Sequence, residues 1–183
     1  MDERTLLVGG PLSVVGGVSV YPLTPRRPID PNAAQPITFP DRHLYSQFGG
    51  SVAIGNGLVA VGAKMAGQTR QDTDGAVYVF RQEESEWKLV QKLVAPGEPG
   101  EALGRHFGST VKFSLRNLVV GAPLEDDEHP TDSVGATYVF SSTPEGIFDA
   151  ETVQKLIPLR GSEVKFMASG ASPRSSRARR RRP

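Results

Sequence analysis

The sequence contains no cysteine, few aromatic residues (7% of 183) and no long apolar run. The lack of cysteine excludes disulfides and thiolate chemistry, yet it leaves the compartment open because disulfide-free proteins occur everywhere. No segment reaches the roughly 18 apolar residues that a membrane-spanning helix needs. The acidic start at residues 1–4 and the glycines that interrupt residues 6–20 predict strands rather than a secretory signal. No asparagine opens an N-x-Ser/Thr sequon, so the sequence gives no positive sign of secretion.

Signatures of catalysis are also missing. The sequence has no Gly-x-Ser-x-Gly elbow, phosphate loop, His-Glu-x-x-His or Gly-x-Gly-x-x-Gly motif. His43 and His106 both follow an arginine and precede a Phe-Gly pair, but no base partner recurs with them, so we interpret them as polar linker residues. We therefore predict that the protein is not an enzyme and has no catalytic residue and no cofactor.

Charge is distributed unevenly along the chain. The formal net charge is +1, yet six of the 21 basic residues are arginines between Arg174 and Arg182. The rest of the chain is mildly acidic and offers no basic groove for a phosphate backbone. The arginine-rich tail has three interpretations: a nuclear-localisation or nucleic-acid-binding patch, a solubilising surface tail, or an out-of-frame or mis-spliced reading of GC-rich sequence.

Glycine and proline are abundant, with 20 and 15 residues, and they separate short runs of aromatic and β-branched residues. This composition favours turns and strands over helices. Asn56-Gly57 lies between two apolar runs and predicts a tight hairpin, because both turn residues need a positive φ. We therefore predict an all-β fold.

Residues 107–140 form a repeat unit that has an earlier copy starting at Phe48. An offset of 59 superposes the Phe-Gly and Val-Gly-Ala positions, and an offset of 60 superposes Gly-Ala and Tyr-Val-Phe. A fixed period near sixty indicates a repeated supersecondary unit, because each copy needs neighbours to cover its apolar face. The residues that define the repeat are Phe48, Gly49, Gly62, Ala63, Phe107, Gly108, Gly121, Ala122 and Pro123.

The repeat divides the chain into five segments. Residues 48–106 and 107–160 are predicted to be two full four-stranded units. Residues 1–47 hold a partial unit that lacks its first strand, followed by a proline-rich connection. Residues 161–168 resemble the first strand of a further unit, and the Gly, Ala, Ser, Pro and Arg composition of residues 169–183 predicts a disordered tail.

The pattern of Phe-Gly, Val-Gly-Ala-Pro and Gly-Ala-Thr-Tyr-Val-Phe resembles the FG-GAP repeat, the blade of the β-propeller in integrin α subunits. The resemblance spans about residues 5–166 and is strongest over 48–157. It implies four-stranded antiparallel propeller blades stacked around an axis. Because propellers have four to eight blades, two full blades plus partial ones predict an incomplete propeller, and we expect the chain to be a fragment of a larger one.

Calcium-binding members of this family carry an Asp-rich loop between the Phe-Gly and Gly-Ala-Pro strands. Here Gly55-Asn56-Gly57 and residues 114–117 occupy that place, and neither supplies the required oxygen ligands. Asp72-x-Asp74-Gly75 is interpreted as a turn, because an EF-hand loop needs further ligands and other spacings. The acidic run of residues 125–129 is interpreted as a solvated loop. We therefore predict no metal site.

Long connections follow the Gly-Ala strand in both units, at residues 64–74 and 123–133. Antiparallel strand order puts them at the same end of their sheets, opposite the tight turns. Loops vary without disturbing a core, so we predict the partner-binding surface there, with mixed charges that favour a protein or glycan partner. The candidate residues are Arg70, Asp72, Glu125, Asp126, Asp127 and His129.

Two functional classes follow from these observations. The first is a non-enzymatic protein- or glycan-binding module of integrin-like blades, with self-association through uncovered blade flanks. The alternative is a nucleic-acid-associated or nuclear protein addressed by the arginine-rich tail; outside this tail, the chain offers no basic surface for nucleic acid. The resemblance suggests the cell surface or the extracellular space, whereas the residues themselves leave the localisation unknown.

Overall fold

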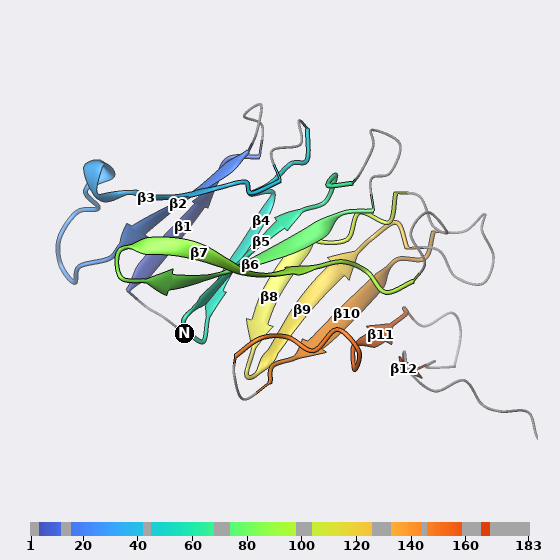
Figure 1. The fold of residues 1–183 in the computed structure, drawn as a ribbon. Coiled ribbons are helices and arrows are strands. Elements are labelled where there is room, and N and C mark those ends of the chain that lie inside the picture. Colours follow the sequence, from blue (N-terminus) through green and yellow to red (C-terminus); the bar gives the residue numbers. More distant parts are fainter. Residues whose placement is uncertain are drawn as a thin grey trace, which may run out of the picture.

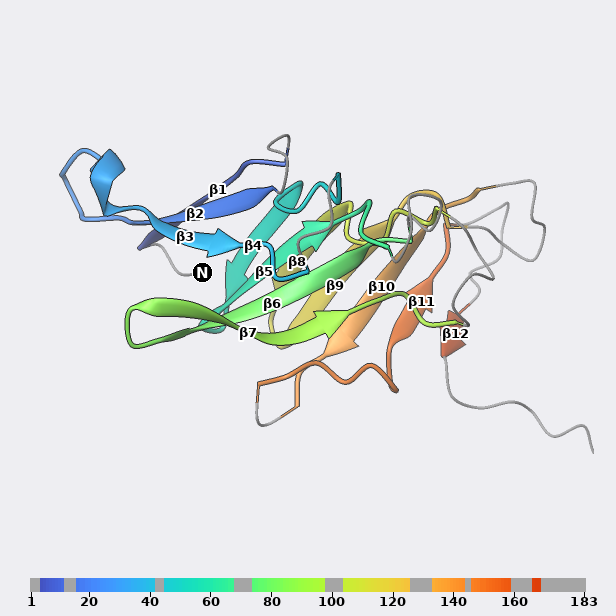
Figure 2. The same ribbon diagram turned by 45° about the horizontal axis from the view of Figure 1, so that its top comes forward.

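A computed structural model describes residues 4–11, 16–41, 45–67, 74–97, 104–125, 133–143 and 146–158, together with the backbone of 166–168. These residues form three antiparallel sheets and one short 3-10 turn, η1, at Pro31–Ala33. The all-β prediction is confirmed. The sheets follow one another in chain order, from the blue N-terminal sheet to the yellow-to-orange C-terminal one (Figures 1 and 2).

The first two sheets follow the predicted strand order. The N-terminal sheet consists of β1 (Thr5–Gly9), β2 (Gly17–Pro22) and β3 (Gln35–Thr38). The central sheet consists of β4 (Ser51–Gly55), β5 (Leu58–Ala63), β6 (Ala76–Glu83) and β7 (Glu86–Leu93). In both sheets each strand pairs with the next strand along the chain, as in a meander.

The C-terminal sheet has the same order with an additional outer strand. It consists of β8 (Thr110–Ser114), β9 (Asn117–Ala122), β10 (Ala136–Ser141), β11 (Gln154–Leu156) and β12 (Phe166–Ala168). Its β8–β9 hairpin has the same length as the β4–β5 hairpin of the central sheet. In the central hairpin, Asn56 and Gly57 have φ values of 55° and 73°, so the predicted tight turn is present.

Strand β12 differs from the sequence expectation. Residues 161–168 are predicted to open a further blade, and residues 161–165 lie outside the described part of the chain. The described remainder, Phe166–Ala168, pairs with β11 as the outermost strand of the C-terminal sheet. This portion therefore extends an existing sheet instead of starting a new one.

The short connection before this segment accounts for the difference. Gly161 stands at the repeat position of Gly108, but it follows the end of β11 at Leu156 by five residues, whereas Gly108 follows the end of β7 at Leu93 by fifteen. Five extended residues reach at most about 17 Å, which is little more than the width of a four-stranded sheet. The free edge of β11 is nearer to the end of this connection than the far side of the sheet is, and it offers unpaired N–H and C=O groups.

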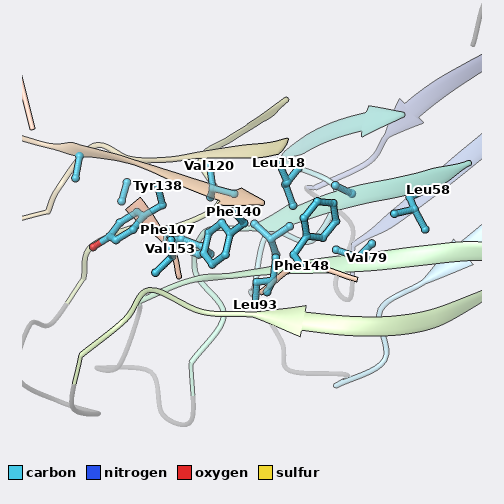
Figure 3. Packing of buried hydrophobic residues seen from close by; sticks show 14 residues of the cluster. Leu58, Val79, Leu93, Phe107, Leu118, Val120, Tyr138, Phe140, Phe148 and Val153 are labelled. Atoms are coloured by element: carbon cyan, nitrogen blue, oxygen red, sulfur yellow. The ribbon is translucent and has the colours of Figure 1, made fainter. Parts of the chain in front are cut away.

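Two apolar layers hold the three sheets together. One lies between the N-terminal and central sheets and contains Val18, Ile37, Phe48, Val59 and Tyr78. The other lies between the central and C-terminal sheets, where Phe107, Phe140 and Phe148 sit between the facing strands (Figure 3). The central sheet therefore contributes side chains to both layers.

The phenylalanine of each Phe-Gly pair is a centre of aromatic packing. Phe48 and Phe107 are both 0% exposed. The Phe48 ring packs edge-on against Tyr78 at 5.7 Å between centroids, and Phe107 packs edge-on against Tyr138 at 5.4 Å. Aromatic pairs in this geometry contribute beyond their buried area. The phenylalanine of each Phe-Gly pair therefore packs the start of its unit against the third strand of the same unit, which is β6 for Phe48 and β10 for Phe107.

The glycine of each Phe-Gly pair touches the preceding sheet. Gly49 and Gly108 have φ values of 89° and 86°, which favour glycine. A Cβ on Gly49 would lie 2.5 Å from the carbonyl oxygen of Gly17, and one on Gly108 would lie 2.6 Å from that of Ala76. The Phe-Gly turn is therefore the point where one unit seats on the previous one, and a side chain would prevent that approach.

Candidate binding surface

The long connections lie at one end of the sheets. In the central sheet, Ala63 at the end of β5 pairs with Ala76 at the start of β6, and the tight Asn56-Gly57 turn lies at the other end. In the C-terminal sheet, Ala122 and Ala136 pair in the same way. We call the end that carries these connections the long-loop end.

The bases of the two long loops are closed by the same hydrogen bond. In the central sheet, the Gly75 amide donates to the Ala66 carbonyl over 2.9 Å. In the C-terminal sheet, the Gly135 amide donates to the Glu125 carbonyl over 3.0 Å. Ala66 and Glu125 each follow the Gly-Ala pair at the same distance in sequence, so the repeat encodes the loop base as well as the strands.

The two loop bases are linked through the start of the second unit. The Phe107 amide donates to the Asp74 carbonyl over 2.7 Å, and Gly75 and Phe107 form an isolated parallel bridge. The Leu124 amide then donates to the Arg105 carbonyl over 3.2 Å. The residues that carry the first loop are therefore bonded to the segment that carries the second.

Five of the six candidate residues lie outside the described part of the chain: Arg70, Asp72, Asp126, Asp127 and His129. The sixth, Glu125, is 4% exposed and lies inside the molecule. Its Oε1 accepts a hydrogen bond from Lys155 Nζ over 2.6 Å, and its Oε2 lies 3.8 Å from Arg105 Nε. Glu125 therefore anchors the base of its loop and has no side-chain surface to offer a partner.

Arg105 completes this buried charge cluster. Its guanidinium is almost fully buried and donates to the Pro96 carbonyl over 2.8 Å. Because isolated buried charges are costly, the carboxylate of Glu125 has to stay next to the two cations. The cluster therefore ties the connection between the sheets to the start of the second long loop.

A related cluster occurs in the central sheet. Tyr78 and Lys92 pair across β6 and β7, as Tyr138 and Lys155 do across β10 and β11. Asp41 supplies the carboxylate: it accepts hydrogen bonds from Tyr78 Oη and Lys92 Nζ, each over 2.6 Å. Each lysine also lies over the face of its tyrosine ring, at 5.4 and 5.9 Å from the centroids.

Both tyrosines stay neutral over the ordinary pH range. Burial raises the pKa of Tyr78 well above its usual value, and the neighbouring Asp41 raises it further. Burial and the charge of Glu125 likewise raise the pKa of Tyr138. The two clusters therefore stabilise the fold through hydrogen bonds and charge contacts. Neither tyrosine is suited to serve as a base.

His106 lies beside the second Phe-Gly pair. Its φ of 55° matches that of Gln47, which precedes the first Phe-Gly pair. Burial and the charge of Lys64 lower the pKa of His106 below its usual value. The imidazole is therefore uncharged at neutral pH, and its backbone carbonyl accepts a hydrogen bond from Ser109 Oγ over 2.8 Å.

One sequence pattern indicates part of the tyrosine clusters. Gln-Lys-Leu recurs at the end of both units, and its lysine faces the tyrosine of Tyr-Val-Phe in each sheet. The carboxylates do not occupy equivalent repeat positions, since Asp41 precedes one unit and Glu125 lies within the other. Repeat arithmetic therefore could have found the lysines but not their acidic partners.

Neither a metal site nor a membrane span is found in the part of the chain that the structure describes. Among those residues no three His, Asp or Glu side chains gather in a way that could hold a metal ion. Over the same residues, no helix has the length and apolar character needed to cross a membrane.

Comparison with known families finds one family whose repeat matches the chain. Residues 33–80 and 87–140 match the FG-GAP repeat, which together is more than half of the chain. The protein belongs to the FG-GAP repeat family. Such repeats generally mediate protein interactions and are typically non-enzymatic. A search among curated proteins found no match.

Proposed function

We propose that this FG-GAP protein is a non-enzymatic module that binds a protein or a glycan at the long-loop end. The observation that carries the proposal is the hydrogen-bonded link between the bases of the two long loops, through Asp74 and Phe107. Loops on a rigid base can vary in sequence without disturbing the core, and fixed bases keep neighbouring loops in register.

The buried cluster supports the same assignment. Glu125 is the last described residue before the loop of residues 126–132, and it is held by Lys155 from β11 and Arg105 from the preceding connection. A loop whose base is fixed by charge contacts loses less conformational entropy when it binds a partner. We therefore assign partner contact to Arg70, Asp72, Asp126, Asp127 and His129, and we assign a supporting role to Glu125.

A loop replacement tests this assignment. Residues 126–132 are replaced by a Gly-Ser linker of equal length, which keeps Pro123, Glu125 and Ser133 in place. Wild-type and replaced chains are compared on arrays of purified glycans and purified proteins. We expect the ligands bound by the wild-type chain to lose at least tenfold in affinity, with an unchanged thermal melt.

A matched control changes the opposite end of the central sheet. Glu84 has a φ of 55° in the β6–β7 turn, so replacing Glu84-Ser85 by Asn-Gly suits the turn and leaves the long loops untouched. This control should bind as the wild-type chain does. If every ligand binds the loop-replaced chain as well as the wild-type chain, the assignment of the binding surface is wrong.

A further inference from the structure

The outer face of the C-terminal sheet carries a hollow at the place where the central sheet receives a Phe-Gly turn. The hollow has a volume of about 340 Å³ and is lined by Thr110, Gly121, Gly135, Ala136, Thr137 and Pro158, among others. It lies on the face turned away from the layer that contains Phe107 and Tyr138. We call this hollow the flank seat.

The central sheet shows what such a seat holds. Ser51 Oγ donates a hydrogen bond to the Gly108 carbonyl over 2.7 Å. A Cβ on Gly62 would overlap that same carbonyl, so the glycine makes room for it. Gly75 bridges to Phe107 beside this contact. The seat on the central sheet is therefore occupied by the turn Phe107-Gly108.

The N-terminal sheet repeats this arrangement. A Cβ on Gly9 would overlap the carbonyl oxygen of Gly49, and Gly9 stands at the repeat position of Gly62. The Gly10 amide donates to the Gly17 carbonyl over 2.8 Å next to this contact. The described part of the chain thus contains two occupied seats, and each holds the backbone of a Phe-Gly turn against a glycine of the preceding sheet.

The flank seat has the same parts at the same repeat positions. Thr110 corresponds to Ser51, Gly121 to Gly62, and Ala136 to Ala76. The Thr110 side chain is exposed, and its hydroxyl can donate as Ser51 does. A Cβ built on Gly121 has only Thr110 as its nearest neighbour among the described residues, in place of an incoming carbonyl.

We infer that the flank seat is a docking site for the Phe-Gly turn of an FG-GAP unit on a separate polypeptide. The inference is independent of the binding proposed at the long-loop end. It rests on continuity with the two occupied seats, because the glycine at this repeat position already receives the carbonyl of a Phe-Gly turn at Gly9 and at Gly62, and the hydroxyl donor recurs at Ser51 and Thr110. The ligand is an extended segment with a buried phenylalanine, a glycine at positive φ and an exposed carbonyl.

Two other occupants fit the seat less well. The chain's own Gly161-Ser162 resembles Gly108-Ser109 but is preceded by Arg160 in place of phenylalanine, and the connection from Leu156 is short. In a second copy, both Phe-Gly turns among the described residues are already packed, with Gly49 against Gly17 and Gly108 against Ala76. A separate FG-GAP unit is the source that offers a free turn.

A peptide titration tests the inference on the full chain. The probe is a fluorescent peptide with the sequence of residues 104–114, GRHFGSTVKFS, and binding is followed by fluorescence polarisation. The control peptide exchanges Gly108 for Val, which cannot take the positive φ or the close approach. We expect saturable binding of the first peptide and at least a tenfold weaker binding of the second.

Two variants of the full chain locate the binding. Gly121→Ala places a methyl group where the incoming carbonyl would lie and should weaken peptide binding at least tenfold. Thr110→Val removes the hydroxyl donor and should weaken it about fivefold. Leu115→Ser, which changes an 89% exposed residue of the β8–β9 turn at the far end of the sheet, is the control and should bind normally. Thermal melts should show that all three variants remain folded.

Several outcomes would overturn the inference. Absence of peptide binding up to millimolar concentration is one, and equal binding to wild type and to Gly121→Ala is another. If the chain alone forms dimers in sedimentation and Gly121→Ala dissociates them, the occupant is a second copy and our assignment of a separate chain is wrong. The loop replacement at residues 126–132 reports on the long-loop end, so failure of either proposal can be told from failure of the other.

Discussion

The central and C-terminal sheets are built from one repeat, yet only the central sheet is buried on both faces. Every residue of β5 is buried, whereas buried and partly exposed residues alternate along β9. The difference follows position in the stack, because the N-terminal sheet covers one face of the central sheet and the C-terminal sheet covers the other. Strand formation is thus encoded in each repeat, but two-sided burial depends on neighbours.

Sequence differences between the two sheets match this exposure. Leu58 and Val77 face the layer that the C-terminal sheet covers, and their repeat equivalents are Asn117 and Thr137. Polar residues suit a sheet face that no other described sheet covers. That face nevertheless keeps Gly121 unchanged from Gly62, and Gly121 lines the flank seat.

The largest contrast is expected between the two carboxylates. Glu125→Ala leaves the buried guanidinium of Arg105 without its counter-charge and should lower the free energy of unfolding by roughly 3–5 kcal/mol. Asp41→Ala removes a half-exposed pair with Lys92 and one hydrogen bond from Tyr78, and should cost about 1–2 kcal/mol. Urea unfolding followed by Trp87 fluorescence measures both. Equal losses would mean that the two clusters are energetically alike.

The second contrast compares the same glycine in an occupied and an open seat. Gly62→Ala forces a methyl group against the Gly108 carbonyl and should cost about 2–3 kcal/mol. In Gly121→Ala the methyl group meets only the Thr110 side chain, which can rotate away, so we expect a change within about 0.5 kcal/mol. Urea midpoints decide the matter. A large loss in Gly121→Ala would show that the outer face is already filled.

The third contrast exchanges one pair of equivalent residues in opposite directions. Val77→Thr buries a hydroxyl in the layer between the sheets and should cost about 1–3 kcal/mol. Thr137→Val replaces a hydroxyl by a methyl group on a partly exposed face and should change the free energy of unfolding by no more than about 0.5 kcal/mol. Thermal melts of the two single variants provide the measurement. If Thr137→Val also destabilises the fold, the outer face is more tightly packed than one-sided burial implies.

The smallest expected effect concerns His106. Its pKa is lowered in the folded chain, so on acidification through about pH 6.5 the unfolded chain takes up a proton that the folded chain resists. Stability should therefore fall as the pH falls from 7 to 5.5. His106→Gln copies Gln47, which has the same φ of 55°, and should reduce this slope. Melting temperatures across that range test it, and identical slopes would rule out a role for His106.

Much of the fold could be predicted because the same distinctive motifs recur at equivalent positions of the two units. The Phe-Gly, Gly-Ala and Tyr-Val-Phe motifs locate strands, turns and loop bases, and the Asn56-Gly57 turn is where its residues require it to be. Phe166–Ala168, the described part of the segment 161–168, pairs with β11 instead of opening a further blade, because strand propensity does not say which edge a strand will join. That choice depends on the reach of the preceding connection.

The candidate site could be predicted only in outline. Loop length locates the long-loop end, but it does not reveal whether a given acidic residue points outward. Glu125 follows Ala122 as Ala66 follows Ala63, and Ala66 is buried, so the repeat itself argued for burial of Glu125. Its cationic partners come from segments outside the loop, which a linear reading of the acidic run could not supply.

The side-chain hydrogen bonds that join the central and C-terminal sheets have a consequence for synthesis of the chain. They connect residues 57 to 65 positions apart, as in Ser51 to Gly108, Asn56 to Leu115 and Arg81 to Gly146. At a translation rate of about 5–20 residues per second, a newly made sheet waits roughly 3–13 s for the partner that covers it. During that interval one apolar face of the central sheet is exposed to solvent. Chaperone contact with nascent chains should therefore be greatest just before the second Phe-Gly turn emerges.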